Sequence, residues 1–268
     1  MLQLVKSEHS DRPVVGTPRS FGELCDAFGL VYSEYAKHEY IRSHSSEMRY
    51  GVSQLLNSSQ TFVATVGARV IGTGTVVFDS AAGLPSTEVF GDVIADLRDS
   101  GRRVVEATML ACVPTPGTAA NVTSTLLIPW AFAWAIDQGA DDFCVVVNAK
   151  HLSFWRDLLG FEVLGAPRSC GHVRGAMGYF LRFDLTRLSS PETLTKGFKR
   201  IVLSQMVNEA LLAGEYELTD VDAEYLLDLR PELLDDCTPE GLALLKSERP
   251  GLFDGGDYSY HHPLQYAA

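Results

Sequence analysis

Apolar residues occur at strand spacing and at helical spacing in turn through the first 190 residues. Ser20 is followed by apolar positions with a helical period, which predicts a capped helix from Phe21 towards Tyr35. Alternating β-branched residues predict a hairpin with strands at 61–66 and 70–78. The same patterns predict further strands at 103–113, 142–147, 161–164 and 177–184, and helices at 86–100, 120–138 and 149–159. This order predicts an α/β fold built on a mixed sheet.

The composition changes after about residue 188. Residues 191–246 have a helical pattern, are rich in acidic residues and are interrupted by Pro231 and Pro239. We therefore predict a flexible N-terminal arm at 1–19, a mixed α/β domain at 20–188, and a C-terminal helical extension with a flexible end at 189–268.

The most informative stretch is the strand pattern Glu106-Ala-Thr-Met-Leu-Ala-Cys-Val-Pro114. Side chains alternate along a strand, so Glu106 and Thr108 should share a face, with Leu110 and Cys112 behind them. A carboxylate in such an apolar strand is costly to bury unless it is paired or used. Either Glu106 forms a salt bridge, with Arg102 or Arg103 as the candidate partner, or it takes part in chemistry.

Charge and cysteine content narrow the class of protein. A formal net charge of −12 argues against a nucleic-acid partner. The five cysteines are widely spaced without a C-x-x-C pair, which argues against structural zinc and is typical of a reducing compartment. With no run of 18 apolar residues and no signal-peptide pattern at the start, we expect a cytoplasmic protein without a transmembrane segment.

Several phrases together resemble a known family. The run from Asn148 to Gly165, with Leu-Gly-Phe-Glu-Val-Leu-Gly at its end, resembles the last part of the GNAT acyltransferase core. The phrase Gly83-Leu-Pro-Ser-Thr-Glu-Val-Phe-Gly-Asp92, the run Gly101-Arg-Arg-Val-Val-Glu106, Val31-Tyr-Ser-Glu-Tyr35 and Tyr40-Ile41 resemble long-chain N-acyl amino acid synthases, relatives of the acyl-homoserine-lactone autoinducer synthases. The resemblance covers roughly residues 20–186 and not the tail.

This resemblance implies a GNAT-like fold and acyl transfer from acyl carrier protein to an amino group. It implies that Glu106 accepts the amine proton, directly or through a water. Thr108 could orient water or substrate, or be an ordinary strand threonine. The resemblance also implies an oxyanion site made by backbone N–H groups where the central strand splays, at Leu110, Ala111, Cys112 and Val113, with a bulge there.

The donor's pantetheine arm is expected between the strands at 104–113 and 143–147, with its phosphate near the next helix start. Gly117 and Thr118 are candidate contacts in the loop Thr115-Pro-Gly-Thr-Ala-Ala-Asn121, which lacks the basic residue of CoA-using relatives. Asn148 and His151 could contact pantetheine amides or the acceptor. Alternatively, Asn148 is a helix N-cap and His151 lies in the first turn.

Three residues are candidates for holding an acceptor carboxylate: Arg42, His172 and Arg174. Arg49 is an alternative, and a solvated loop would explain His172 and Arg174 equally well. An acidic carrier protein needs a basic docking face. Two groups of cations could provide it, although each could also be an ordinary solvated surface: Arg98, Arg102 and Arg103, or Lys196, Lys199 and Arg200.

The sequence therefore predicts an N-acyltransferase that moves a long-chain acyl group from acyl carrier protein to an amino acid or similar small amine. It is expected to hold no metal and no permanent cofactor, because acyl-phosphopantetheine or acyl-CoA enters as the donor. The alternatives are an acyl-CoA-dependent N-acetyltransferase and a non-catalytic acyl-binding module of the same fold.

Overall fold

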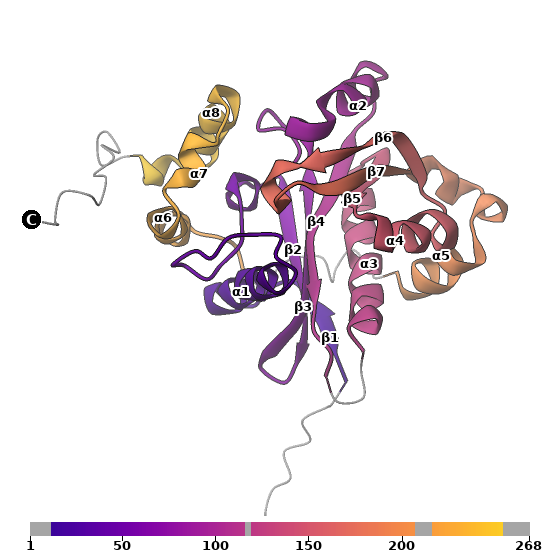
Figure 1. The fold of residues 1–268 in the computed structure, drawn as a ribbon, viewed down its shortest axis with the longest axis horizontal. Helices are drawn as coiled ribbons and strands as arrows, with labels where there is room; N and C mark the ends of the chain where they lie inside the picture. Colours follow the sequence, from indigo (N-terminus) through magenta and orange to yellow (C-terminus); the bar gives the residue numbers. More distant parts are fainter. Residues whose placement is uncertain (1–11, 116–118, 207–215, 254–268) are drawn as a thin grey trace, which may run out of the picture.

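In the part of the chain that is described, seven strands form one mixed sheet (Figure 1). The structure is a computed structural model, and it describes residues 12–115, 119–206 and 216–253. The strand order is β1-β2-β3-β4-β5-β7-β6, in which β4 and β5 run parallel and the other neighbours are antiparallel. The strands are β1 (Val14–Gly16), β2 (Ser59–Val66), β3 (Arg69–Phe78), β4 (Val104–Cys112), β5 (Asp142–Val147), β6 (Glu162–Cys170) and β7 (Ala176–Asp184).

The helices lie on both faces of this sheet and in the C-terminal segment. They are α1 (Phe21–Lys37), α2 (Thr87–Asp99), α3 (Ala120–Asp137), α4 (Ala149–Ser153), α5 (Lys196–Ile201), α6 (Asp220–Leu229), α7 (Glu232–Asp235) and α8 (Pro239–Glu248). None of the helices in the described ranges combines the length and the apolarity needed to cross a membrane. The predicted mixed α/β fold is confirmed.

Local sequence signals account for many element boundaries. The Ser20 hydroxyl accepts a hydrogen bond from the Glu23 backbone N–H, so Ser20 caps α1 as predicted. The hairpin of β2 and β3 turns at Gly67, whose φ of 61° is readily adopted by glycine. Two differences concern the region after β5: α4 ends at Ser153 and continues as the π-helical segment Phe154–Leu158, and β6 extends to Cys170.

The two faces of the sheet bury different clusters. On one face, α2 packs Phe90, Ile94 and Leu97 against β3, β4, β5 and β7. On the other face, α3 contributes Phe132, which stacks on Phe143 of β5 with ring centroids 4.2 Å apart. Figure 1 shows α1 and α6–α8 on one side of the sheet and α3, α4 and α5 on the other. The next features concern the first of these faces.

The parallel pair β4 and β5 separates partway along. Its register runs from Val104 opposite Asp142 to Ala107 opposite Val145, and then stops. Beyond that point β5 continues to pair with β7, while β4 continues to pair with β3. Since the ladder ends there, the backbone of β4 after Ala107 has no strand partner on the β5 side. This splay is the opening expected for the donor arm.

A bulge reverses the faces of the second half of β4. Thr108 lies opposite Thr75 and Ala111 opposite Thr73, so Met109 and Leu110 share one partner position. Met109 has a φ of 52°, and this backbone conformation accommodates the extra residue of the bulge. The prediction that Leu110 and Cys112 follow Glu106 and Thr108 on one face is therefore wrong. Cys112 packs in the cluster on the α3 face instead.

Both predicted flanking segments contribute to the packed structure. Within the predicted N-terminal arm, β1 forms an edge strand on β2, which corrects the description of that part as flexible; residues 1–11 lie outside the described residues. Beyond residue 188, Phe198 of α5 is fully buried and stacks on Phe183 at 4.5 Å. The predicted boundary at 188 therefore runs through a shared core. The end at 254–268 is also outside the described residues.

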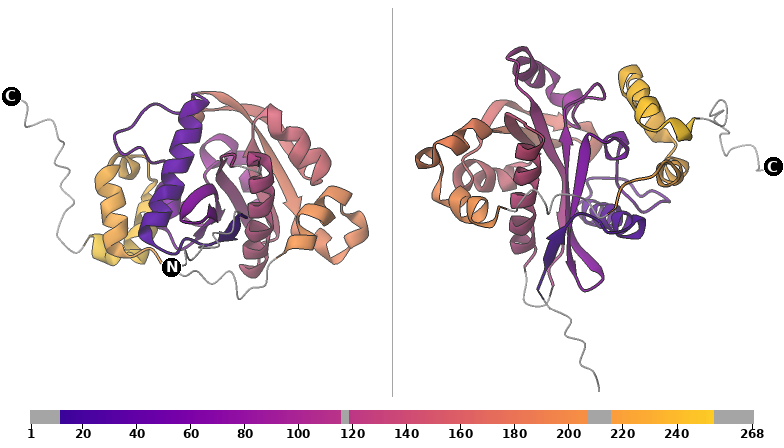
Figure 2. Two further views of the ribbon diagram at one scale, coloured as in Figure 1. Left: turned by 90° about the horizontal axis from the view of Figure 1, so that it is seen from below. Right: turned by 180° about the vertical axis from the view of Figure 1, so that it is seen from behind.

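The helices α6–α8 cover α1 and the loop before β2 (Figures 1 and 2). Leu226 and Leu227 of α6 pack in one buried cluster with Phe28 of α1 and with Tyr50. The Tyr50 hydroxyl donates to the Leu226 carbonyl at 2.7 Å, and Arg230 donates to the Tyr50 carbonyl at 2.8 Å. The C-terminal helices thus fix the loop that contains Tyr50.

Candidate active site

Glu106 lies on β4 with only 3 % of its surface exposed. Its strand neighbours are Val77 on β3 and Cys144 on β5. Ser86 donates to one Glu106 carboxylate oxygen from both its backbone N–H, at 3.0 Å, and its hydroxyl, at 2.7 Å. The expectation of a buried acid on this strand is therefore met by the fold, with a neutral serine as its partner.

The alternative salt bridge from Glu106 to Arg102 or Arg103 is wrong. Arg102 binds Asp142 at 2.6 Å and Asp184 at 2.8 Å. The Arg103 guanidinium donates to the Gln138 carbonyl at 2.6 Å. Both cations are held at the start of β4 and β5, so neither of them neutralises Glu106.

Burial without a cation raises the pKa of Glu106 to about 7. Desolvation is the largest cause, and the nearby charge of Asp79 acts in the same direction. The two hydrogen bonds from Ser86 lower the pKa and so limit the rise. A carboxyl group with this pKa exchanges a proton readily near neutral pH, which is the property that a general base requires.

Ser86 precedes the first residue of α2, where a serine commonly caps the helix. Its side chain makes no capping hydrogen bond, because its hydroxyl is used by Glu106. Sequence reasoning assigned no role to Ser86. Its one signal was membership of the Gly-Leu-Pro-Ser-Thr phrase on which the family resemblance rests.

The bulge bears on the predicted oxyanion donors. Thr108 is half-buried and lies one residue before the bulge, on the Glu106 face. Leu110 is 39 % exposed, and Ala111 and Cys112 remain paired with β3. The Val113 N–H donates to the Ile71 carbonyl at 2.9 Å, so it is not free to bind an oxyanion, and its predicted role is wrong.

Asn148 and His151 begin the segment after β5. Asn148 occupies the N-cap position of α4, but its side chain caps nothing. Its amide nitrogen donates to the Tyr40 hydroxyl at 2.9 Å, while its side-chain oxygen is buried and has no hydrogen-bond partner among the residues that the structure describes. Desolvation and the charges of Lys150 and His38 lower the pKa of His151. Gly117 and Thr118, the two predicted contacts of the donor, are outside the described residues.

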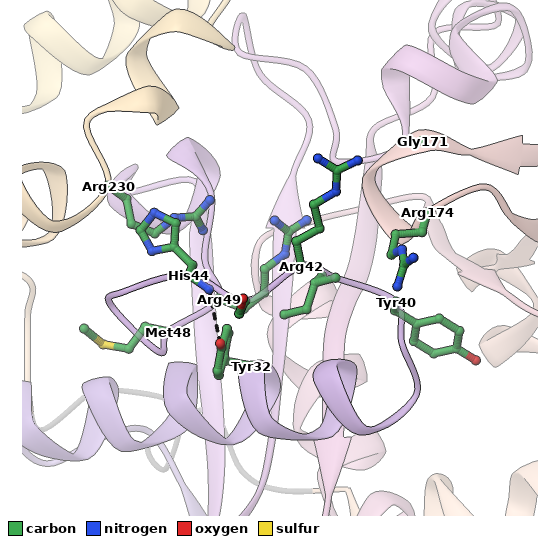
Figure 3. A pocket seen from close by; sticks show the side chains of 11 residues that line it. Tyr32, Tyr40, Arg42, His44, Met48, Arg49, Gly171, Arg174 and Arg230 are labelled. Carbon is green, nitrogen blue, oxygen red and sulfur yellow. Dashed lines mark hydrogen bonds between the residues drawn. The ribbon is translucent and has the colours of Figure 1, made fainter. Parts of the chain in front are cut away.

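A cavity of about 610 Å³ lies beside α1, between the loop after α1 and the turn that joins β6 to β7 (Figure 3). The predicted acceptor residues Arg42 and Arg174 both line it, and the side chain of His172 lies outside the described part of the structure. Arg49, the sequence alternative, lines it too. Further lining residues are Tyr32, Tyr40 and Arg230.

Tyr40 connects this cavity to the end of β5. Its hydroxyl accepts the hydrogen bond from Asn148, and in Figure 3 its ring points away from the arginines. The ammonium group of Lys150 lies 5.7 Å from the centre of the same ring. Tyr40 therefore links the cavity wall to the splayed strands. The sequence had singled it out only within the family resemblance.

Arg230 is the lining residue that the sequence could not indicate. It follows α6 in the C-terminal segment, 180 positions after the Tyr50 carbonyl that it binds. It also donates to Glu232 at 2.8 Å. In the described ranges, no group of three or more His, Cys, Asp or Glu residues has the arrangement of a metal site.

Comparisons with known proteins identify the family of the chain. A family model described as N-acyl amino acid synthase FeeM matches residues 26–184, which is more than half of the chain. The structure of FeeM, an N-acyl amino acid synthase from uncultured soil microbes, has a TM-score of 0.60 and 22 % identity over 72 % of this chain and 97 % of that chain. A search of curated proteins gives no match.

Two further solved structures share the fold. BjaI, a CoA-dependent acyl-homoserine lactone synthase solved with SAM and isopentyl-CoA, has a TM-score of 0.51 and 16 % identity over 80 % of this chain and 97 % of that chain. TofI, in a ternary complex with an inhibitor and MTA, has a TM-score of 0.51 and 14 % identity over 65 % of this chain and 91 % of that chain. The matched residues contain Glu106, both splayed strands and the loops of the cavity. The chain therefore belongs to the FeeM family of N-acyl amino acid synthases and is an acyltransferase.

Proposed function

We propose that this protein transfers a long-chain acyl group from the phosphopantetheine thioester of acyl carrier protein to the amine of an amino acid. The observation that carries the proposal is the buried Glu106, with a pKa raised to about 7, where β4 and β5 separate. A family that joins acyl groups to amino acids needs a base for the attacking amine, and Glu106 has the required protonation behaviour near neutral pH.

The reaction proceeds by addition and elimination at the thioester carbonyl. The amine nitrogen attacks the carbonyl carbon, and Glu106 takes the amine proton directly or through a water that Thr108 helps to orient. Within the bulged segment Leu110 to Cys112, the backbone N–H groups that point away from β3 stabilise the oxyanion. The carbon–sulfur bond then breaks, the amide forms, and the thiolate leaves and takes up a proton. The side chains of Phe154 and Trp155 have no acidic proton to give to the thiolate. That proton therefore comes from solvent or from another group.

The side chain of Asn148 is the observation that supports a pantetheine arm in the space between β4 and β5. Its buried side-chain oxygen has no hydrogen-bond partner within the described part of the chain, and an unpaired buried acceptor is costly. An amide N–H of pantetheine would satisfy it. Gly117 and Thr118 are proposed contacts for the donor's phosphate at the start of α3, as the family resemblance implies.

The choice of acyl carrier protein as donor rests on surface charge. The patch of Arg98, Arg102 and Arg103 is the weaker candidate for a docking face, because Arg98 binds Asp79 and Arg102 binds Asp142. Lys196, Lys199 and Arg200 on α5 are exposed and form no ion pair within the described residues. Carrier protein is acidic, so α5 is its proposed docking site.

Because none of the five cysteines is in a disulfide, we place the reaction in the cytoplasm.

The test is product analysis with the purified protein. It is incubated with a mixture of amino acids and either acyl carrier protein loaded with a long acyl chain or the matching acyl-CoA, and products are identified by mass spectrometry. We expect N-acyl amino acids from the carrier-protein donor, with turnover reduced about 100-fold or more in Glu106→Gln. A product formed only from acyl-CoA would replace the donor assignment. Equal turnover by Glu106→Gln at saturating substrates would refute the role of Glu106.

A charge-reversal variant tests the docking site. Lys196→Glu combined with Lys199→Glu should raise KM for the carrier protein and leave turnover of acyl-pantetheine unchanged, since these side chains are exposed and far along the chain from Glu106. Lys246→Glu, on α8, provides the matched control. An equal effect of both changes would exclude α5 as the docking surface.

A further inference from the structure

The cavity beside α1 concentrates positive charge in an acidic protein. The chain has a formal net charge of −12, yet Arg42, Arg49, Arg174 and Arg230 all line the cavity, and none of the described residues that line it is acidic. In Figure 3, Arg42 and Arg49 extend in the same direction from the loop after α1, Arg174 comes from the β6–β7 turn, and Arg230 comes from the C-terminal segment. Four arginines from three parts of the chain therefore line one cavity.

Arg49 is the least compensated of these cations. Its Nε is buried and has no hydrogen-bond partner within the described residues. Burial, followed by the neighbouring charge of Arg230, lowers its pKa, while Tyr35 and Asp236 oppose this effect. Arg49 remains charged at neutral pH, because an arginine guanidinium is protonated throughout that range. A half-buried guanidinium with an enclosed Nε and no ion pair among the described residues is unfavourable, so the fold retains a charge that a bound anion would stabilise.

Two more guanidinium groups lack a carboxylate partner. Arg42 is exposed and forms no ion pair in the described ranges. The Arg174 side chain donates to the Glu39 carbonyl at 3.3 Å, which leaves most of its donors free. Arg230 differs, because Glu232 and the Tyr50 carbonyl already bind it. Three cations are thus free to bind a ligand.

One carboxylate accounts for only part of this charge. A single carboxylate pairs in a bidentate manner with one guanidinium, or bridges two. The third guanidinium would then remain uncompensated in a region where arginines already repel one another. A ligand with two anionic groups would engage all three.

We propose that the cavity binds an acceptor amino acid with two carboxylates, an aspartate- or glutamate-like molecule, with Arg49 as its buried anchor. This proposal rests on the proposed function, because it names the acceptor of that reaction. Arg49 holds one carboxylate at the inner end, and Arg42 and Arg174 hold the other from the two loops. The amine is thereby presented towards the end of β5, where Tyr40 contacts Asn148.

Binding measurements without any acyl donor test this proposal independently of catalysis. Isothermal titration calorimetry compares L-glutamate and L-aspartate with their side-chain amides, L-glutamine and L-asparagine, which have nearly the same shape and one charge fewer. We expect at least one of the two acids to bind at least about tenfold more tightly than its amide, because each charge-assisted pair contributes on that order. Equal binding of acids and amides would overturn the proposal.

Three variants locate the site. Arg49→Met and Arg42→Met should each reduce the preference for the acid over the amide at least about fivefold, since each removes one cation and keeps much of the side-chain bulk. Arg49→Lys should restore part of the preference. Arg69→Met, at the exposed start of β3, is the control and should change nothing. If Arg49→Met folds poorly, Arg42→Met still decides, because Arg42 is exposed.

Two further outcomes are distinguishable. Tight binding of an acid without any N-acyl product in the donor assay would leave the anion site standing and refute the proposed function. Tight binding of inorganic phosphate or CoA that is lost in Arg49→Met, with no preference for acids over amides, would assign the cavity to a donor phosphate and overturn the proposal.

Discussion

Ser86 gives two hydrogen bonds to the same carboxylate oxygen of Glu106, one from its backbone and one from its hydroxyl. The two residues are 20 positions apart and meet because α2 begins beside the middle of β4. Without an arginine in contact, these hydrogen bonds are the main influence that keeps the pKa of Glu106 from rising further. Ser86 therefore adjusts the base while Glu106 provides it.

Replacing Ser86 tests this relationship. Ser86→Ala removes the hydroxyl bond and keeps the backbone bond, so the pKa of Glu106 should rise by about one unit, because a hydrogen bond to a charged group contributes about 1.5 kcal/mol or more. The rising limb of the kcat–pH profile should move to higher pH by the same amount. Steady-state rates with saturating substrates, measured across the neutral range, would detect the shift.

The serine that directly follows α2 provides the control. Ser100 donates to the Asp96 carbonyl at the opposite end of the helix and is exposed. Ser100→Ala should leave the profile in place. An unchanged profile in Ser86→Ala would mean that the limb belongs to a group other than Glu106.

The raised pKa of Glu106 also affects the free energy of unfolding. Its ordinary value is 4.5 and its folded value is about 7, so between these values the folded state binds more protons than the unfolded state. Stability then falls as pH rises through this window and is level above it. Glu106→Gln removes this dependence and should gain about 2–3 kcal/mol relative to the parent between about pH 5 and about pH 8. Urea denaturation at both pH values measures this difference; parallel curves would contradict the buried, unpaired carboxylate.

Asn148 gives a prediction about the donor. Asn148→Ala removes the proposed acceptor for a pantetheine amide, so KM for acyl-pantetheine should rise about tenfold with little change in KM for the amino acid. Tyr40→Phe keeps Asn148 but removes the hydroxyl that receives its amide hydrogen bond. This second variant should raise the acceptor KM, because Tyr40 lines the cavity. Initial-rate kinetics with each substrate varied in turn separates the two effects, and identical changes in both variants would argue against distinct contacts.

A substitution of Asp142 tests how much its buried ion pairs stabilise the central strands. It is fully buried at the start of β5, where Arg102 and Arg182 both donate to it at 2.6 Å. Asp142→Asn leaves two cations without their shared anion and should cost about 3–5 kcal/mol of unfolding free energy. Asp157→Asn breaks the exposed pair with Arg156 and should change the unfolding free energy far less, because solvent screens that pair. Chemical denaturation compares the two, and similar losses would show that the buried network is not what stabilises this end of the sheet.

The sequence indicated the burial of Glu106 but not its partner. Burial followed from one acid within an apolar strand pattern, which is a local signal. Arg102 seemed a candidate because it is near in sequence, yet it binds Asp142 and Asp184, which are 40 and 82 positions away. Ser86 could not be chosen, since its contact with Glu106 depends on how α2 is placed against the sheet.

The bulge in β4 was expected, but its effect on the strand faces was not. A positive φ commonly marks glycine, and here Met109 adopts it. The residue type therefore carried no signal, and the period-two argument failed after Thr108. The failure reversed the assignment of Leu110 and Cys112 while leaving Glu106 and Thr108 correctly on one face.

The cavity was anticipated in part. Arg42 and Arg174 were chosen as acceptor residues from two separate loops, and the fold brings both to one cavity. Their role in binding the acceptor stays a prediction. Arg230 was missed because the C-terminal segment lies outside the family pattern, so no sequence feature connects it with the loop after α1.

The hydrogen bonds that join Tyr50 to Leu226 and Arg230 have a consequence while the ribosome synthesises the chain. A chain leaves the ribosome from its N-terminus, and structured units form as they emerge. The strands around Glu106 are complete once β7 has emerged, whereas Arg230 and the helix that orders Tyr50 come later. A nascent chain thus has its proposed base before its proposed acceptor cavity is finished, so acylation of cellular amines should begin only after α6 and Arg230 have emerged.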